Sequence, residues 1–155
     1  MASPQSKTRN RGVLRLLAHR SRDKRRGPAV RPPGDPQHDY WQAGSHPEIV
    51  ERVWDGLGKN LPRGSRALVF GTPALVHPGS GIVIAFALGT EYALRLPRQV
   101  GNERGHAGLR TVARWAGGSS TDLVRECGPE WIFGSFMSEE IAWCEAAYRE
   151  CEEAR

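Results

Sequence analysis

The sequence lacks most of the short motifs that reveal a chemical function. Its three cysteines form no C-x-x-C pair, and it has neither a G-x-x-x-x-G-K-S/T loop nor a G-x-G-x-x-G loop. The first absence disfavours a zinc ribbon or a dithiol redox site, and the second disfavours a nucleotide cofactor bound by a glycine-rich loop. The histidines are scattered without the spacing of metal ligands; they are His19, His38, His46, His77 and His106. We therefore expect no metal and no cofactor.

The sequence also lacks a long apolar run. No charged residue occurs between Arg66 and Glu91, but Pro73 and Pro78 interrupt this interval, and its longest apolar run is Ile82–Leu88. A helix that spans a membrane needs about 20 apolar residues. The interval is therefore predicted to form buried β-hairpins, and no membrane contact is expected. Unpaired cysteines and the absence of an apolar leader favour a soluble, cytoplasmic protein.

Acidic residues are scarce at the start of the chain. Residues 1–40 hold ten Lys or Arg against three Asp or Glu, whereas the remaining residues hold twelve against fourteen. This composition, together with the Arg-Pro-Gly stretches, predicts a disordered basic tail over residues 1–39, with one or two amphipathic turns around Val13–Leu17, and a single domain over residues 40–155. The tail is either a dispensable extension, a targeting segment or a weak, non-specific contact to nucleic acid. The residues expected to make that contact are Arg20, Arg22, Lys24, Arg25 and Arg26.

The domain itself shows the periodicities of helices and strands. Pro47 opens a helix capped by Ser45 or His46, and a second helix follows Ser138. Short runs typical of strands lie between them, and Gly89-Thr90 is predicted to form a tight type II′ hairpin turn. The strand runs cover residues 67–70, 74–77, 82–88, 92–96 and 131–133. The predicted fold class is α+β: an antiparallel β-meander with one face covered by the N-terminal and the C-terminal helix.

Candidate binding residues come from polar groups near the predicted sheet. His77 and Arg95, with Arg104 and His106 from the glycine-rich loop over residues 98–128, would form a polar pocket if the loop folds over the strand ends. A simpler interpretation of Arg95 is a lateral ion pair with Glu91, four residues away on the same strand face.

Two further features bear on function. His77-Pro78-Gly79-Ser80-Gly81 does not match the G-x-S-x-G turn of nucleophilic hydrolases, so Ser80 is predicted to lie in a plain turn. Trp143 lies beside the buried stripe of the last helix and would be partly exposed, as an aromatic at a protein contact is. With no catalytic motif, the sequence favours a protein-interaction or adaptor module over nucleic-acid association, and either over a small enzyme built around His77 and Arg95.

Overall fold

The computed structural model describes residues 4–20, 30–33, 46–98, 100, 127–128 and 130–153. Its centre is an antiparallel sheet of six strands that follow one another in chain order. The strands are β1 (Val30–Arg31), β2 (Arg66–Val69), β3 (Thr72–Val76), β4 (Val83–Leu88), β5 (Glu91–Arg95) and β6 (Trp131–Phe133). The α+β class and the meander are therefore confirmed, and the four longest strands lie where the apolar alternation placed them.

The two tight hairpins show how the turn residues set the register. Leu88 pairs with Glu91 across Gly89 and Thr90, and Gly89 alone of these two has a positive φ, of 64°. This is the pattern of the predicted type II′ turn. Between β2 and β3, both Phe70 and Gly71 have positive φ, as a type I′ turn requires. Strand β3 therefore begins at Thr72, earlier than the sequence suggested.

The helix after residue 46 begins as its sequence predicts. His46 is the N-cap, and its Nδ1 accepts a hydrogen bond from the backbone N–H of Glu48 at 3.1 Å. Helix α2 (Pro47–Glu51) continues as the π-helix η1 (Arg52–Leu57) and ends at Gly58. A Cβ at Gly58 would lie 2.8 Å from the side chain of Leu75, so glycine lets η1 pack closely on β3. A short 3₁₀ turn, η2 (Arg63–Ser65), leads into β2.

The N-terminal segment contains a helix that packs on the sheet. Residues Pro4–Arg20 form helix α1, and Val13, Leu16 and Leu17 are buried in the main hydrophobic core. Asn10 fixes the helix to the sheet, since its amide donates to Gly81 O at 2.7 Å and accepts from Val83 N at 2.9 Å. Tertiary packing stabilises a helix that would be marginal in isolation. Most of residues 21–45, which include the predicted domain boundary at residue 40, lie outside the described residues.

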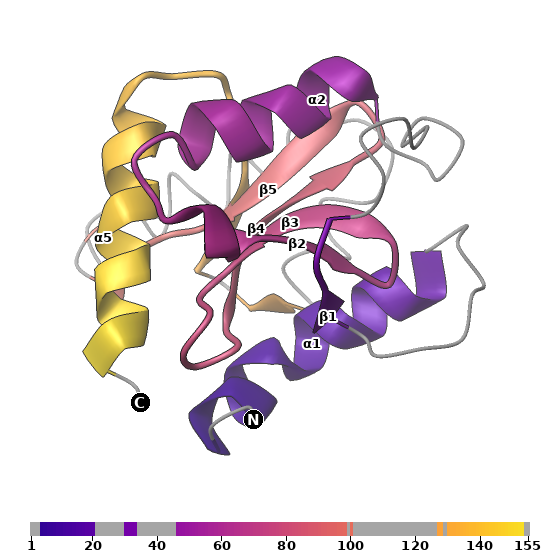
Figure 1. Cartoon of the computed structure of the whole chain (residues 1–155), viewed down its shortest axis with the longest axis vertical. Coiled ribbons are helices and arrows are strands. Elements are labelled where there is room, and N and C mark those ends of the chain that lie inside the picture. Colours follow the sequence, from indigo (N-terminus) through magenta and orange to yellow (C-terminus); the bar gives the residue numbers. More distant parts are fainter. Residues whose placement is uncertain are drawn as a thin grey trace.

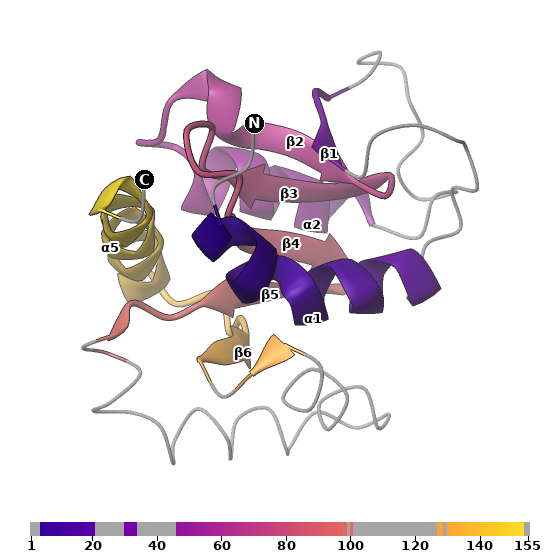
Figure 2. The ribbon, with the colours of Figure 1, turned by 90° about the horizontal axis from the view of Figure 1, so that it is seen from below.

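The helices enclose the sheet from three sides. In Figure 1, α2 and η1 lie above the sheet and α1 lies below it, while α5 (Glu139–Glu153) stands along one side. Figure 2 confirms that α1 and α2 lie on opposite faces of the sheet. The sequence predicted the helices that contact β4 and β5, α2 and α5, but not the cover provided by α1. None of the helices in the described part of the chain is long and apolar enough to cross a membrane.

Candidate functional site

His77 and Arg95, the centre of the predicted polar pocket, are both fully buried. His77 follows strand β3, and its Nδ1 accepts from the backbone N–H of Ser80 at 2.9 Å. Because Nδ1 is an acceptor, the hydrogen of the ring lies on Nε2. Nε2 lies 2.9 Å from Glu152 Oε1 on α5, although the N–H is not aligned with this oxygen for a hydrogen bond. The ring also stacks obliquely on Tyr148, with 4.7 Å between the centroids.

Ser80, His77 and Glu152 stand in the order of a serine–histidine–acid relay. The Oγ of Ser80 is 3.0 Å from His77 Nδ1 and accepts from the backbone N–H of Ile82 at 3.3 Å. Ser80 is fully buried, so a substrate from solvent does not reach its hydroxyl. The same Nδ1 atom accepts the backbone N–H of Ser80, which is a turn-closing contact. The arrangement holds the β3–β4 turn, in agreement with the plain turn predicted from the sequence.

Arg95 has a structural set of partners. Its Nε donates to Val83 O at 3.0 Å, and its terminal nitrogens approach Glu130 Oε1 at 3.3 Å and Arg9 O at 3.4 Å. The guanidinium lies 4.7 Å from the centroid of the Trp131 ring, and burial lowers the pKa of Arg95 to about 10. Arg95 thus links β5 to β4, β6 and α1.

The ion pair expected between Arg95 and Glu91 is replaced by the contact with Glu130. Four residues of extended strand separate Glu91 from Arg95 by about 13 Å, too far for a lateral pair even though both side chains share a face. The other two residues of the predicted pocket, Arg104 and His106, lie outside the described residues. So do Arg22, Lys24, Arg25 and Arg26, and of Arg20 the structure describes only the backbone in α1.

A second polar cluster joins α2–η1, β5 and α5. The hydroxyl of Tyr92 donates to Glu140 Oε1, and both side chains are buried. Arg52 from η1 lies 3.9 Å from the same carboxylate oxygen. Burial, followed by the hydrogen bond with Glu140, raises the pKa of Tyr92 to about 12. Tyr92 therefore stays a neutral hydrogen-bond donor across the physiological range.

This cluster fixes the backbone of the segment between β6 and α5. Three successive N–H groups are bound: Ser135 donates to Glu140 Oε2 at 3.0 Å, Phe136 to the Tyr92 hydroxyl at 2.8 Å and Met137 to Glu140 Oε1 at 3.2 Å. The carbonyl of Met137 accepts from Arg52 at 3.3 Å. We call residues 134–138 the display loop. Its backbone is held by buried side chains, which leaves its own side chains free to face solvent.

The display loop exposes two apolar side chains. Phe136 is 56% exposed and Met137 is 41% exposed, and they are the only large hydrophobic residues that are exposed within the described ranges. Phe136 has a φ of 61°, in the left-handed region that a bulky residue rarely adopts. Its ring meets Tyr92 edge-on at 5.2 Å and lies 5.7 Å from the Arg52 guanidinium. The loop therefore presents a fixed apolar pair next to a cation.

The sequence pattern indicates Trp143 as the contact residue and does not indicate this pair. The structure places Trp143 partly buried on α5, packed against the core. Phe136 and Met137 lie between small polar residues just before a helix, where an apolar residue usually packs back on the helix as a staple. The sequence signal was only the presence of two large apolar residues in a turn; their exposure depends on Tyr92, which is distant in the chain.

Among the described residues, no three His, Cys, Asp or Glu side chains are grouped so that they could hold a metal ion. Cys127, Cys144 and Cys151 are buried and form no disulfide, and burial raises the pKa of Cys144 to about 12. Comparison of the chain with protein-family models, with curated proteins and with solved structures finds no match.

Proposed function

We propose that the protein is a protein-interaction module that docks on its partner through Phe136 and Met137 of the display loop. The observation that carries the proposal is a large aromatic residue that is both solvent-exposed and held at a positive φ. A non-glycine residue in this region costs of order 1–3 kcal/mol, and such strain concentrates at binding sites. Glycine or asparagine would fit the same turn with less strain and without exposing an apolar ring.

The fixed backbone of the display loop supports this role. A docking segment that is already ordered loses little conformational entropy on binding, so more of the contact energy appears as affinity. Here three N–H groups and one carbonyl are bound to Glu140, Tyr92 and Arg52 before any partner arrives. Aromatic and methionine side chains are also enriched in the cores of protein interfaces. Two side chains bury too little area for a flat dimer interface, but they can fill a pocket on another protein.

The proposal is tested by affinity capture from cells that contain the protein, followed by quantitative mass spectrometry. A Phe136→Ser, Met137→Ser double variant should lose at least one protein that the native chain retains, and its affinity for that protein should fall about thirtyfold, the equivalent of about 2 kcal/mol at a hot spot. Both side chains are exposed, so the thermal midpoint should change little.

Two matched variants sharpen the test. Lys59→Ser with Arg63→Ser changes two exposed residues far from the display loop along the chain and should leave capture unchanged. Trp143→Ala tests the alternative docking residue that the sequence favoured. If the display-loop variant retains the same proteins with the same affinity, the proposal is wrong; if only Trp143→Ala loses a partner, the contact surface lies on α5 instead.

A further inference from the structure

Helix α1 carries one sign of charge. Its sequence, Pro4–Arg20, contains five Lys or Arg residues and no Asp or Glu. Three of them, Lys7, Arg11 and Arg15, recur every four residues, which places these positions on one face of a helix. Five more basic residues follow within the next eleven positions of the sequence; they are Arg22, Lys24, Arg25, Arg26 and Arg31.

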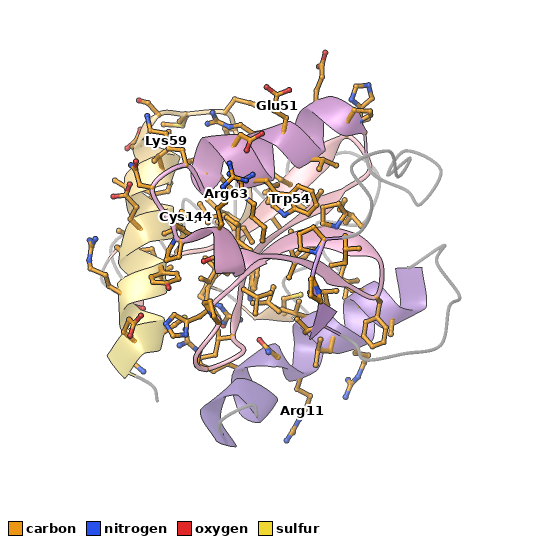
Figure 3. The ribbon with its side chains drawn as sticks, viewed as in Figure 1. Arg11, Glu51, Trp54, Lys59, Arg63 and Cys144 are labelled. Atoms are coloured by element: carbon orange, nitrogen blue, oxygen red, sulfur yellow. The ribbon has the colours of Figure 1, made fainter. Side chains whose placement is uncertain are left out.

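The orientation of α1 is set by the contacts on its other face. Asn10, Val13 and Leu17 are buried against the sheet, and the backbone carbonyl of Arg9 accepts from the buried Arg95. Arg11 and Arg15 are exposed on the side that faces away. Figure 3 shows Arg11 extending from α1 away from the body of the molecule, and Figure 2 shows α1 as the outer layer over one face of the sheet.

We propose that the outward face of α1, with Arg11 and Arg15 at its centre, binds the phosphate backbone of nucleic acid. A cationic helix could also bind an anionic membrane, but interfacial helices insert an apolar face into the lipid. In α1 that face is already used, since Val13, Leu16 and Leu17 are buried in the protein core. A protein partner would need an apolar anchor among the charges. The described exposed side chains of α1 are Arg11, Arg15 and Ala18, and they include no large apolar anchor. An electrostatic contact to a polyanion is therefore the interaction that this face supports.

The arrangement predicts weak, salt-dependent and sequence-independent binding. Each phosphate that a Lys or Arg neutralises releases condensed counterions, so the logarithm of the binding constant falls with the logarithm of salt concentration, with a slope of about −0.9 per contact on duplex DNA. Non-specific affinities of this kind are about 10⁻⁵ M at physiological salt. No base contact is required, and none is proposed.

The test uses fluorescence anisotropy of a labelled duplex DNA of random sequence, titrated with the full chain at several salt concentrations. Arg11→Gln with Arg15→Gln should weaken binding at every salt concentration and reduce the magnitude of the slope by about 1.8, because two contacts are lost. Lys59→Gln with Arg63→Gln removes the same charge from exposed positions on the far side of the sheet and should leave the slope unchanged.

Three outcomes would overturn the proposal: no binding of the native chain to DNA at low salt, equal slopes for the two double variants, or tighter binding to phosphatidylserine vesicles than to DNA. All four substituted residues are exposed, and a thermal scan of each variant verifies folding. The Phe136→Ser, Met137→Ser variant should bind DNA as the native chain does. A negative result in the DNA-binding experiment therefore does not bear on the proposal that the protein docks through the display loop.

Discussion

The hydroxyl of Tyr92 on β5 and the carboxylate of Glu140 on α5 form a buried hydrogen bond between residues that are 48 positions apart. Each partner also holds the display loop, since Tyr92 accepts the N–H of Phe136 and Glu140 accepts those of Ser135 and Met137. The pair therefore couples the packing of α5 on the sheet to the shape of the proposed docking segment. A change that disturbs this bond should affect both.

Gly134 is the position where the loop passes closest to Tyr92. A Cβ there would lie 1.8 Å from Cε2 of the Tyr92 ring, and the ring cannot withdraw because its hydroxyl is bound to Glu140. We expect Gly134→Ala to reduce the free energy of unfolding by about 3 kcal/mol, the upper range for overpacking a core. Urea denaturation measures this loss. Gly64→Ala is the matched control, because the nearest atom to its Cβ is 3.8 Å away, and its midpoint should stay close to that of the native chain.

Alkaline pH should weaken the fold through Tyr92. Its pKa is about 12 in the folded chain against 10 when exposed, with burial as the main cause. Below pH 10 the phenol is neutral in both states and its contribution to stability is complete; between pH 10 and 12 only the unfolded chain ionises, so that contribution is lost as pH rises. The maximum effect is about 3 kcal/mol.

The measurement is the urea midpoint as a function of pH from 8 to 12. Tyr92→Phe should be less stable than the native chain at pH 8, because it removes the hydroxyl that donates to Glu140 and leaves the Phe136 N–H without its acceptor. The variant should lose less stability than the native chain between pH 10 and 12. The buried thiol of Cys144 acts in the same direction from pH 9 upward, since its pKa is also raised to about 12. A Cys144→Ala background therefore removes the contribution of this thiol, and the comparison with Tyr92→Phe cancels those of Cys151 and Arg95, which both chains share. Parallel curves for the native chain and Tyr92→Phe would contradict the prediction.

The sequence predicted the elements whose pattern is local and missed those that depend on distant partners. The hairpin at Gly89-Thr90 and the helix from Pro47 follow from turn chemistry and capping that neighbouring residues supply. Helix α1 has only a few apolar residues among many basic ones, so its composition indicated disorder. Its stability depends on Asn10, which accepts a hydrogen bond from Val83 of β4, and on Arg95 of β5, which donates to the carbonyl of Arg9.

The candidate site was hidden for a similar reason. Glu140 occurs in the first turn of α5, where an acidic residue is ordinarily solvent-exposed and favoured by the helix dipole. Only the approach of Tyr92 and Arg52 turns it into a buried acceptor for the display loop. Conversely, His77 and Arg95 looked like site residues because they are polar near a sheet, and the structure uses both in packing.

Asn10 should be the main polar anchor of α1. Asn10→Ala removes the hydrogen bonds to Gly81 O and Val83 N and leaves the Val83 N–H without its acceptor in a buried environment. We expect a loss of about 2 kcal/mol. Hydrogen exchange should show faster exchange of the α1 amides and of Val83, with little change in β5. Arg11→Ala, on the exposed face, is the control and should leave exchange unchanged. If the α1 amides of Asn10→Ala exchange as slowly as those of the native chain, apolar packing alone holds the helix.

Met137 should react with peroxide in the folded chain. Its side chain is 41% exposed, while its N–H and carbonyl are bound to Glu140 and Arg52. Hydrogen peroxide transfers one oxygen to the thioether and becomes water, so we expect Met137 sulfoxide to form at about the rate of free methionine. Because only the backbone of Met137 is bonded, the free energy of unfolding should change by less than about 0.5 kcal/mol. Peptide mass mapping against time measures the oxidation, and a Met137→Leu variant should resist it.

Capture of the display-loop partner should fall on oxidation and return with a methionine sulfoxide reductase, since the sulfoxide puts a polar group where an apolar one docks. Protection of Met137 until the chain unfolds would instead show that this side chain is covered in solution, and the exposed apolar pair would no longer support docking.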